Sequence, residues 1–304
     1  MSGEKSKSSG EFGETIVTEF LKLIGWGSAT PNPTITCWES DKHERPRKKH
    51  GVDFIHNFES PLMNDTQEDI VISVKHTVND YPKNPTNDFK KYILDLGRAL
   101  ECYPSDSQYG NFRVNNYIKE HQRAGVLFWI SSDKNAGNRD IIAEITKFRV
   151  SGLDAYGPIY LVDNKKMDFL IKSINYAKPK YDDIKFNYHH TGYNLGSNSI
   201  DSGSILPVQF ITTNILPLRA NDNILLLFLN EPFSESSLKR SMGFAKAIAS
   251  TWPESIVILY PDYCELDDRE VVQSVKRLFN EEAFISIVKV RSFIEGMKSL
   301  GEES

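Results

Sequence analysis

The chain has 304 residues and a formal net charge of −5, with 39% hydrophobic and 25% charged residues. This length is sufficient for two domains, and the composition is that of an ordinary soluble globular protein. The acidic balance does not by itself indicate nucleic-acid binding, and the absence of any run of about 18 apolar residues argues against a membrane-spanning segment.

The N-terminal segment is predicted to form a helix after a short polar tail. Residues 1–9 are polar and are predicted to be disordered. Ser8 and Glu11 form an S-x-x-E capping box, which predicts that the helix begins there and that Glu11 is a cap. Apolar residues at helical spacing predict its buried face: Phe12, Ile16, Phe20, Leu23 and Ile24. Glu14 lies one turn before Val17, at the edge of this face, where a carboxylate could reach a metal ion; a solvated glutamate is equally compatible with the position.

A basic run, KHERPRKKH, occupies residues 42–50 and follows a connection rich in Pro and Gly. It holds five Lys and Arg against one Glu. A nearly neutral domain with one basic patch can bind a phosphate backbone. The four candidate contacts are Arg45, Arg47, Lys48 and Lys49. A solvated loop explains the run equally well in isolation, but its place just before Asp53 favours phosphate binding.

Two strands are predicted next, over residues 51–58 and 69–77, because both runs are rich in Val, Ile and Phe and a turn-forming stretch separates them. If they pair as an antiparallel hairpin, alternation brings Asp53 and Lys75 near each other on one side of the sheet. Burying a carboxylate and an ammonium is costly unless they are paired or used. A structural ion pair between them is the alternative to a catalytic role.

The order of a helix with a glutamate, G-x-D on one strand and x-x-K on the next resembles the PD-(D/E)XK, or restriction-endonuclease-like, nuclease superfamily. The resemblance covers roughly residues 10–195. It implies a mixed sheet flanked by helices, and it implies that Asp53 and Glu14 bind a divalent metal, Mg²⁺ or Mn²⁺. It further implies that Lys75 orients or activates the attacking water.

The sequence departs from that family pattern at Ser73, where a Glu or Asp is usual. A hydroxyl binds Mg²⁺ more weakly than a carboxylate does. Ser73 and the carbonyl of Val74 are the remaining candidate ligands of the site. A hydrolase that uses Ser73 and Lys75 as a Ser-Lys pair is a remote alternative, because no oxyanion-hole motif accompanies them.

The rest of the first domain is predicted to alternate helices and strands. A helix over 88–102 carries Lys90 and Lys91, which could contact phosphate, although a solvated face explains them more simply. The apolar run 125–131 predicts a strand buried on both faces. The remaining predicted elements are a helix over 138–147, a strand over 157–162, a helix over 165–177 and a strand over 183–189, followed by a Gly/Ser-rich linker over 190–204.

Residues 205–304 predict a smaller domain of repeated βα units with a parallel sheet. Its predicted strands cover 223–229, 255–260 and 283–290, and its helices 235–250, 267–280 and 291–299. The segment holds 10 Lys and Arg against 14 Asp and Glu, a balance of −4. It lacks a phosphate-binding motif, and its strand-end loops carry Asn230, Glu231, Asp262 and Glu265. These acidic loops favour a partner-docking or regulatory domain.

At the scale of the whole chain, SGEFGE-x-I-V-x-x-F-L-K-L-I-G-W, HGVDF and ISVKHT are similar to the nuclease-like "a" subunits of the fourth GAPS bacterial anti-phage system. This similarity implies an oligomeric complex with a second nuclease-like subunit, and defence by DNA degradation. The three cysteines are far apart, and the first ten residues lack an apolar signal core, which favours a cytoplasmic protein without disulfides.

The sequence therefore predicts a metal-dependent DNA endonuclease that acts as a subunit of a defence complex. One alternative is a nuclease-fold subunit that binds DNA, or acts as a scaffold, but no longer cuts. The other is an interaction protein without a role on nucleic acid, which the acidic total favours.

Overall fold

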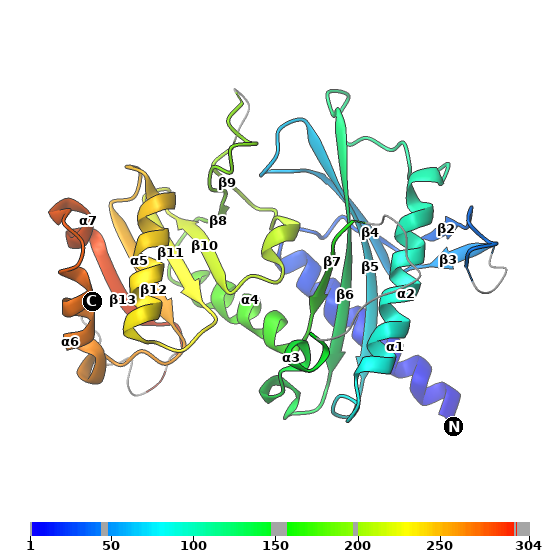
Figure 1. Ribbon diagram of the computed structural model, residues 1–304, viewed down its shortest axis with the longest axis horizontal. Coiled ribbons are helices and arrows are strands. Elements are labelled where there is room, and N and C mark those ends of the chain that lie inside the picture. The colour runs from blue at the N-terminus through cyan, green and yellow to red at the C-terminus, as the bar shows by residue number, and fades with distance from the viewer. Residues whose placement is uncertain (1, 44–47, 147–156, 197–199, 295, 297–304) are drawn as a thin grey trace. The chain divides into compact units, whose positions relative to one another are not determined.

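The computed structural model of the chain describes residues 2–43, 48–146, 157–196, 200–294 and 296, with side chains from Ser9 onward except that of Asn138. The chain divides into two compact units (Figure 1). The first comprises Met1–Asp168 with Leu206–Thr212, and the second comprises Phe169–Ile205 with Thr213–Ser304. No helix in the described ranges is long and apolar enough to cross a membrane.

The first unit is built on a mixed five-stranded sheet with the order β1-β4-β5-β6-β7. β4 and β5 are antiparallel, with Phe54 opposite Ile72, whereas β5–β6 and β6–β7 are parallel. This arrangement confirms the predicted pairing of the two strands around Asp53 and Lys75, and it confirms the mixed α/β class. The strands are β1 (Thr30–Pro31), β4 (Phe54–Glu59), β5 (Thr66–Thr77), β6 (Glu120–Ser131) and β7 (Ile159–Val162).

Helices cover both faces of this sheet. α1 (Ser2–Leu23) passes behind it and α2 (Thr86–Cys102) in front of it in Figure 1. On the α1 side, Phe20 makes an edge-to-face contact with Phe128 at 5.7 Å between ring centroids. On the α2 side, Val71 and Leu127 pack with Ile93, Leu96 and Leu100. Alternate residues of β5 and β6 therefore serve two cores, which explains why β6 has no polar alternation over 125–131.

The structure corrects the prediction for the N-terminal helix. α1 begins at Ser2 rather than at Ser8, so residues 2–8 are helical and Glu11 lies inside the helix instead of capping it. No proline interrupts residues 2–10, and a glycine inside a helix costs only about 1 kcal/mol. The buried stripe is also rotated, because Phe12 is 54% exposed and Gly13 is buried in its place. The remaining members of the stripe are Val17, Phe20, Leu21 and Ile24.

The predicted strand over 51–58 is divided. β3 (Lys49–Gly51) pairs with β2 (Thr34–Thr36) in a two-stranded sheet, and β4 pairs with β5. The chain changes partner at Val52–Asp53, so Asp53 lies at a bend between two strands. The predicted helix over 138–147 is α3 (Ile141–Ile145), which is preceded by a 3₁₀ turn at Ala136–Asn138; residue 147 lies outside the described residues.

The second unit contains a six-stranded sheet with the order β13-β12-β11-β10-β8-β9. As predicted, β11, β12 and β13 are parallel. α5 (Glu235–Ala249) and α6 (Glu265–Lys276) pack on one face, and Ser234 caps α5 by accepting from Ser237 N. Tyr176 of α4 (Asn164–Ala177) contacts Phe228 on the other face. The strands are β8 (Ile184–Asn187), β9 (Ser202–Gly203), β10 (Ile215–Ala220), β11 (Ile224–Leu229), β12 (Ser255–Tyr260) and β13 (Val288–Ser292).

Several predictions for this region were wrong. The strand predicted over 183–189 is β8, but it pairs with β10 of the second sheet rather than with the first sheet. The linker predicted over 190–204 lies inside the second unit, since β9 pairs with β8. Residues 283–290 form α7 (Glu282–Ile287) before β13 (Val288–Ser292), and the strand extends into the helix predicted over 291–299. Residues 295 and 297–299 of that predicted helix lie outside the described residues. β10 was not predicted.

The expected domain ranges of 10–195 and 205–304 consequently differ from the observed units. Residues 169–205 supply two strands to the second sheet, whereas Leu206–Thr212 belongs to the first unit. There the buried indole of Trp26 donates from Nε1 to Leu206 O at 2.8 Å, and Gln209 Nε2 donates to Glu68 Oε1 at 3.0 Å. Both contacts bring together residues more than 100 positions apart in the chain. Local sequence patterns do not predict that residues 206–212 pack in the first unit, because these contacts join distant parts of the chain.

Candidate active site

Asp53 is held at the edge of the sheet where β4 begins. Its backbone N donates to Ile72 O at 3.0 Å, and its Oδ2 accepts from Val74 N at 2.5 Å. The β4–β5 pairing ends at Phe54 and Ile72, and the Asp53 carboxylate provides the hydrogen-bond acceptor for the next free N–H of β5, that of Val74. In an extended strand the N–H and C=O of one residue point to the same side, so the Val74 carbonyl faces this edge too.

The kink at Asp53 corrects the expectation that alternation alone would place Asp53 and Lys75 on one face of the sheet. Asp53 lies in the bend between β3 and β4, which pair with different strands, and its carboxylate lies along the edge. Lys75 and Ser73 project from β5 toward α2, on the same side as Val71. Lys75 Nζ lies 5.7 Å from the centre of the Tyr92 ring.

Glu14 comes from the opposite side, on α1. Its neighbour Gly13 lies against Val74 and His76 of β5, so closely that a Cβ on Gly13 would be 2.4 Å from the His76 Cβ. Burial raises the pKa of Glu14, and the negative charge of Asp53 raises it further, while Lys75 acts in the opposite direction. Asp53 and Lys75 are therefore within electrostatic range of the Glu14 carboxyl.

The three charged residues that the sequence pattern singled out come from different elements: Glu14 from the α1 side of the sheet, Lys75 from the α2 side, and Asp53 from the edge of β5. In the described part of the chain, Asp53 and Lys75 are not joined by an ion pair within 4 Å. Ser73 is buried, and it projects from the same face of β5 as Lys75. The geometry does not support the alternative of a purely structural Asp53–Lys75 bridge.

The sequence of residues 1–166 matches the family model described as the GAPS4 protein PD-(D/E)XK nuclease domain. The chain belongs to this family. The matched segment ends two residues before the first unit's boundary at Asp168, so the nuclease family corresponds to the unit that carries Glu14, Asp53 and Lys75. The comparison with curated proteins and the comparison with solved structures found no match.

His76 is a residue that sequence reasoning missed. In this GAPS4-family domain it ties the first turns of α1 to the end of β5, directly after Lys75. Its Nδ1 lies 2.8 Å from both Ser9 O and Ser9 Oγ, and its Nε2 lies 2.8 Å from Ser132 Oγ. The ring also contacts Phe12 edge-on at 5.5 Å. His76 therefore fixes the position of α1, which carries Glu14, relative to the end of β5, which carries Lys75. In the sequence, only its position directly after Lys75 could have pointed to this role.

A second polar cluster on β5 has a different character. Asp69 is fully buried and accepts from Asn57 Nδ2 and Gln67 Nε2, each at 2.6 Å. His121 Nδ1 lies 2.7 Å from the other carboxylate oxygen, and Arg123 lies nearby at 3.9 Å. Internal partners satisfy this carboxylate, so we assign the cluster to the stability of the fold rather than to the site.

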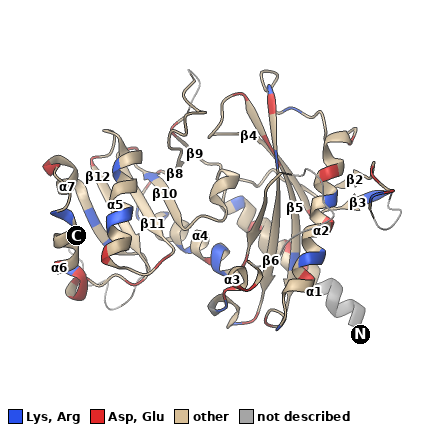
Figure 2. Cartoon of the chain, viewed as in Figure 1, with Lys and Arg blue, Asp and Glu red and all other residues tan. Residues whose placement is uncertain are grey.

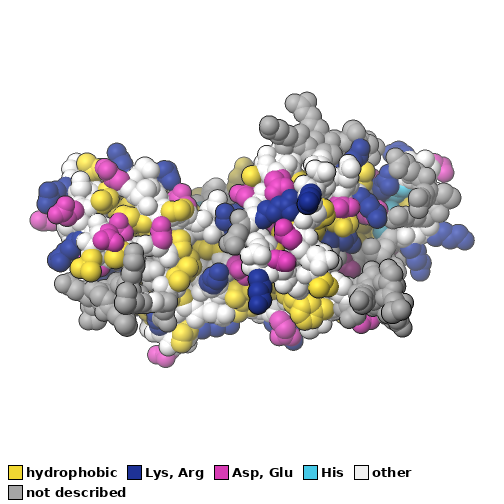
Figure 3. Space-filling model, turned by 90° about the horizontal axis from the view of Figure 1, so that it is seen from below, with side chains coloured by type: hydrophobic (Ala, Val, Ile, Leu, Met, Phe, Trp, Pro, Cys, Tyr) yellow, Lys and Arg dark blue, Asp and Glu magenta, His cyan; other side chains and the backbone are white. Residues whose placement is uncertain are grey.

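The predicted phosphate contacts are only partly described. Lys48 and Lys49 are exposed at the start of β3, whereas Arg45 and Arg47 lie outside the described residues. Lys90 and Lys91 are exposed in the first turns of α2. Figure 2 shows that basic and acidic residues both occur on this helix. On the face shown in Figure 3, basic and acidic side chains are interspersed. Phosphate binding on this domain would accordingly depend on local groups of cations.

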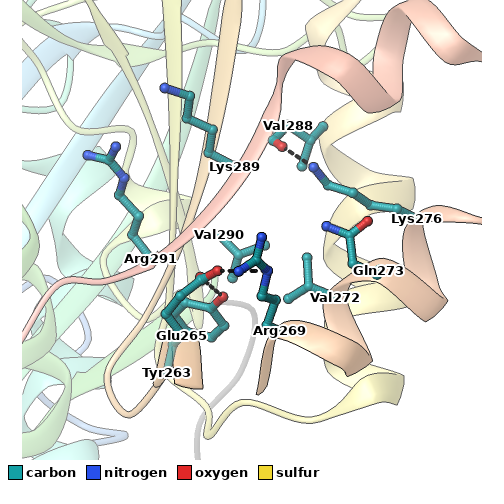
Figure 4. A pocket seen from close by; sticks show the side chains of 10 residues that line it. All are labelled: Tyr263, Glu265, Arg269, Val272, Gln273, Lys276, Val288, Lys289, Val290 and Arg291. Atoms are coloured by element: carbon teal, nitrogen blue, oxygen red, sulfur yellow. Dashed lines mark hydrogen bonds and ion pairs between the residues drawn. The ribbon is translucent and has the colours of Figure 1, made fainter. Parts of the chain in front are cut away.

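The acidic loops of the second unit have partners of their own. Glu231 accepts from Arg240 at 3.1 Å, and Asp262 Oδ1 accepts from Phe233 N at 2.8 Å. In the pocket between α6 and β13 (Figure 4), Glu265 accepts from the Tyr263 hydroxyl and lies 3.8 Å from Arg269. Lys276 Nζ donates to Val288 O at 2.5 Å. These charged side chains therefore stabilise the local structure of the second unit.

Proposed function

We propose that the chain is a metal-dependent DNA endonuclease subunit of a bacterial anti-phage defence complex. The observation that supports this most is that Glu14 of α1, Asp53 in the bend before β4 and Lys75 of β5 lie near enough for the charges of Asp53 and Lys75 to act on Glu14. Membership of the GAPS4 nuclease-domain family supports the same reaction class and the defence setting. Mixing linear and circular DNA with the protein and Mg²⁺, with and without Asp53→Ala, is the primary test.

The side chains present fit a hard divalent cation. Carboxylates of Asp53 and Glu14, the Val74 carbonyl and water are the oxygen ligands that Mg²⁺ or Mn²⁺ prefers, and Mg²⁺ needs only one or two protein carboxylates. Burial and the negative charge of Asp53 raise the pKa of Glu14, and a bound cation would offset both effects by stabilising the charged carboxylate. When bound, the metal would polarise the phosphate and lower the pKa of the attacking water.

The other residues would position the reacting groups. Lys75 would place its ammonium beside the scissile phosphate, where it stabilises the charge that develops on the phosphate oxygens. Asp53 would hold the β5 edge through Val74 N while it binds the metal. Ser73 would supply at most a weak hydroxyl ligand in place of the usual carboxylate.

A second candidate function is a DNA-binding or scaffold subunit that does not cut. Ser73 favours it, because the site then has one carboxylate fewer than the family pattern. The acidic second unit would in either case dock a protein partner, such as a second nuclease-like subunit. Metal-dependent cleavage separates the two functions, and salt-dependent DNA binding separates both from a protein without a nucleic-acid role.

The basic run before Asp53 is expected to contact backbone phosphate. Neutralising Arg45, Arg47, Lys48 and Lys49 together should weaken duplex binding and reduce the salt slope by about 0.9 per lost contact. The measurement is the dissociation constant by fluorescence anisotropy at several salt concentrations. A control with the same loss of charge neutralises Lys178, Lys239, Lys246 and Lys289 of the second unit. An unchanged slope in the first variant would assign the run to solvent.

The raised pKa of Glu14 should make metal affinity depend on pH. The carboxyl retains its proton to a higher pH than an ordinary glutamate, and the protonated form is a poor ligand. As the pH is lowered, Mn²⁺ binding should therefore weaken earlier, that is at a higher pH, than it would with a glutamate of ordinary pKa. Calorimetric titration of wild type and Glu14→Gln tests this, since the variant should bind more weakly and lose this pH dependence. Identical pH profiles would remove Glu14 from the site.

A further inference from the structure

Four potential metal ligands meet where the β2–β3 hairpin lies against the end of α2. Cys37 follows β2, His43 lies in the connection, His50 is the middle residue of β3 and Cys102 ends α2. One candidate ligand atom from each residue lies within 4.8 Å of all the others. His43, His50 and Cys102 are 4%, 2% and 0% exposed. This cluster is separate from Asp53 and Glu14, and it offers soft sulfur and nitrogen donors instead of oxygen.

The measured separations are those of a tetrahedral site. Cys37 Sγ lies 3.3 Å from His43 Nδ1 and 4.0 Å from Cys102 Sγ. Tetrahedral zinc with ordinary bond lengths separates a sulfur from a nitrogen by about 3.6 Å and two sulfurs by about 3.8 Å. A disulfide would bring the two sulfurs to about 2.05 Å instead.

The groups around the cluster also suit a metal. His43 Nε2 lies 3.1 Å from Glu101 Oε2, and this carboxylate would hold the ring so that Nδ1 faces the cluster. The Cys102 sulfur accepts backbone hydrogen bonds from Trp38 and Glu39. Backbone donors of this kind would hold a sulfur ligand in place and offset part of its charge once it is bound to a metal.

We propose that Cys37, His43, His50 and Cys102 bind one structural zinc ion. Thiolates and imidazoles select zinc over Mg²⁺, and four protein ligands leave no open position for catalysis. The ion would cross-link two three-residue strands to α2. Because β3 carries Lys49 and leads through Val52 directly to Asp53, zinc would fix both Lys49 and the approach to the nuclease site. The proposal stands whether or not the chain cuts DNA.

Metal analysis of the full chain is the first test. Protein purified without chelator should contain one zinc per chain by plasma mass spectrometry, and dialysis against Mg²⁺ should not displace it. Cys37→Ser and His50→Ala should lose the zinc. Two controls should keep it: Asp53→Ala, which removes the oxygen site, and Cys264→Ser, which changes the buried cysteine of the second unit.

Cobalt substitution keeps the proposal testable if a ligand variant fails to fold. Wild-type protein refolded with Co²⁺ should show thiolate-to-cobalt charge-transfer absorption in the near ultraviolet and intense tetrahedral bands in the red. The same spectrum should appear in Asp53→Ala and Cys264→Ser. Zinc well below one per chain without a cobalt spectrum, undiminished zinc in folded Cys37→Ser, or a Cys37–Cys102 disulfide in the native protein would each overturn the proposal.

Discussion

Replacing Asp53 by alanine is expected to reduce metal-dependent DNA cleavage to background. The Asp53 carboxylate lies at the edge of β5 against Val74, where it would be the central metal ligand, and Glu14 alone would hold a cation poorly. Lys75→Ala should lower the rate by about 10²- to 10³-fold, the usual effect of removing one charge-stabilising donor. Cleavage of labelled linear DNA at saturating Mg²⁺ or Mn²⁺ measures both effects.

Asp53→Asn is the matched variant for this experiment. An asparagine oxygen can still accept from Val74 N, so the bend before β4 should keep its structure while the charge is lost. Asp53→Asn should retain its unfolding temperature and lose cleavage. If the variant fails to fold, Asp53 is required for the structure, and its role in cleavage is not supported.

Glu19→Ala is a control for Glu14→Gln, because Glu19 is an exposed carboxylate on the same helix that pairs with Lys22.

Ser73 decides how far the family chemistry applies. Ser73→Ala should cost much less than Asp53→Ala because a hydroxyl is a weak ligand, and Ser73→Glu should tighten Mg²⁺ binding. A metal titration of cleavage by wild type, Asp53→Ala and Ser73→Glu, with any partner subunit present, provides the measurement. Equal residual cleavage by wild type and Asp53→Ala at saturating metal would favour the DNA-binding subunit that does not cut.

Gly13→Ala is expected to be the most damaging small substitution on α1. A Cβ there would lie 2.4 Å from the His76 Cβ and 3.6 Å from Val74 Cγ1, so the helix must move away from β5. We expect a loss of about 1–3 kcal/mol in unfolding free energy, which outweighs the gain of about 1 kcal/mol in helix propensity. Cleavage should fall as well, because the neighbouring Glu14 moves with the helix.

Gly10→Ala is the control for that substitution. It lies one turn earlier on the same helix, and a Cβ there would meet no atom within 4 Å. The same gain in helix propensity should then leave stability unchanged or raise it by up to about 1 kcal/mol. Thermal and urea unfolding of both variants compares them directly. If Gly13→Ala proves as stable as Gly10→Ala, the close approach of α1 to β5 is not present in solution.

The sequence by itself determined the elements around the site. Alternating Val, Ile and Phe identified the two strands, their short connection implied an antiparallel pair, and helical spacing placed Glu14 at the edge of a buried face. These signals are local, because side-chain periodicity follows from backbone geometry over a few residues. The order of Glu14, Asp53 and Lys75 along the chain was then sufficient to suggest the nuclease family.

Only the tertiary structure decided which strand joins which sheet. The alternation of Ile184 and Phe186 with polar residues in β8 predicts a strand but not the strand beside it, and pairing with β10 places β8 in the second sheet. The return of Leu206–Thr212 to the first unit depends on contacts such as that of Trp26 with Leu206, which no periodicity encodes. The rotation of α1 similarly depended on the absence of a side chain at Gly13, which an apolar pattern does not record.

The cluster of Cys37, His43, His50 and Cys102 shows the same division. Its first three members are spread over fourteen residues with no C-x-x-C spacing, and the fourth lies more than fifty residues further on. Short ligand spacings can be recognised in a sequence because one loop holds two ligands at a fixed distance. Here a hairpin and the end of a helix supply the ligands, so their proximity exists only once β2, β3 and α2 have packed together.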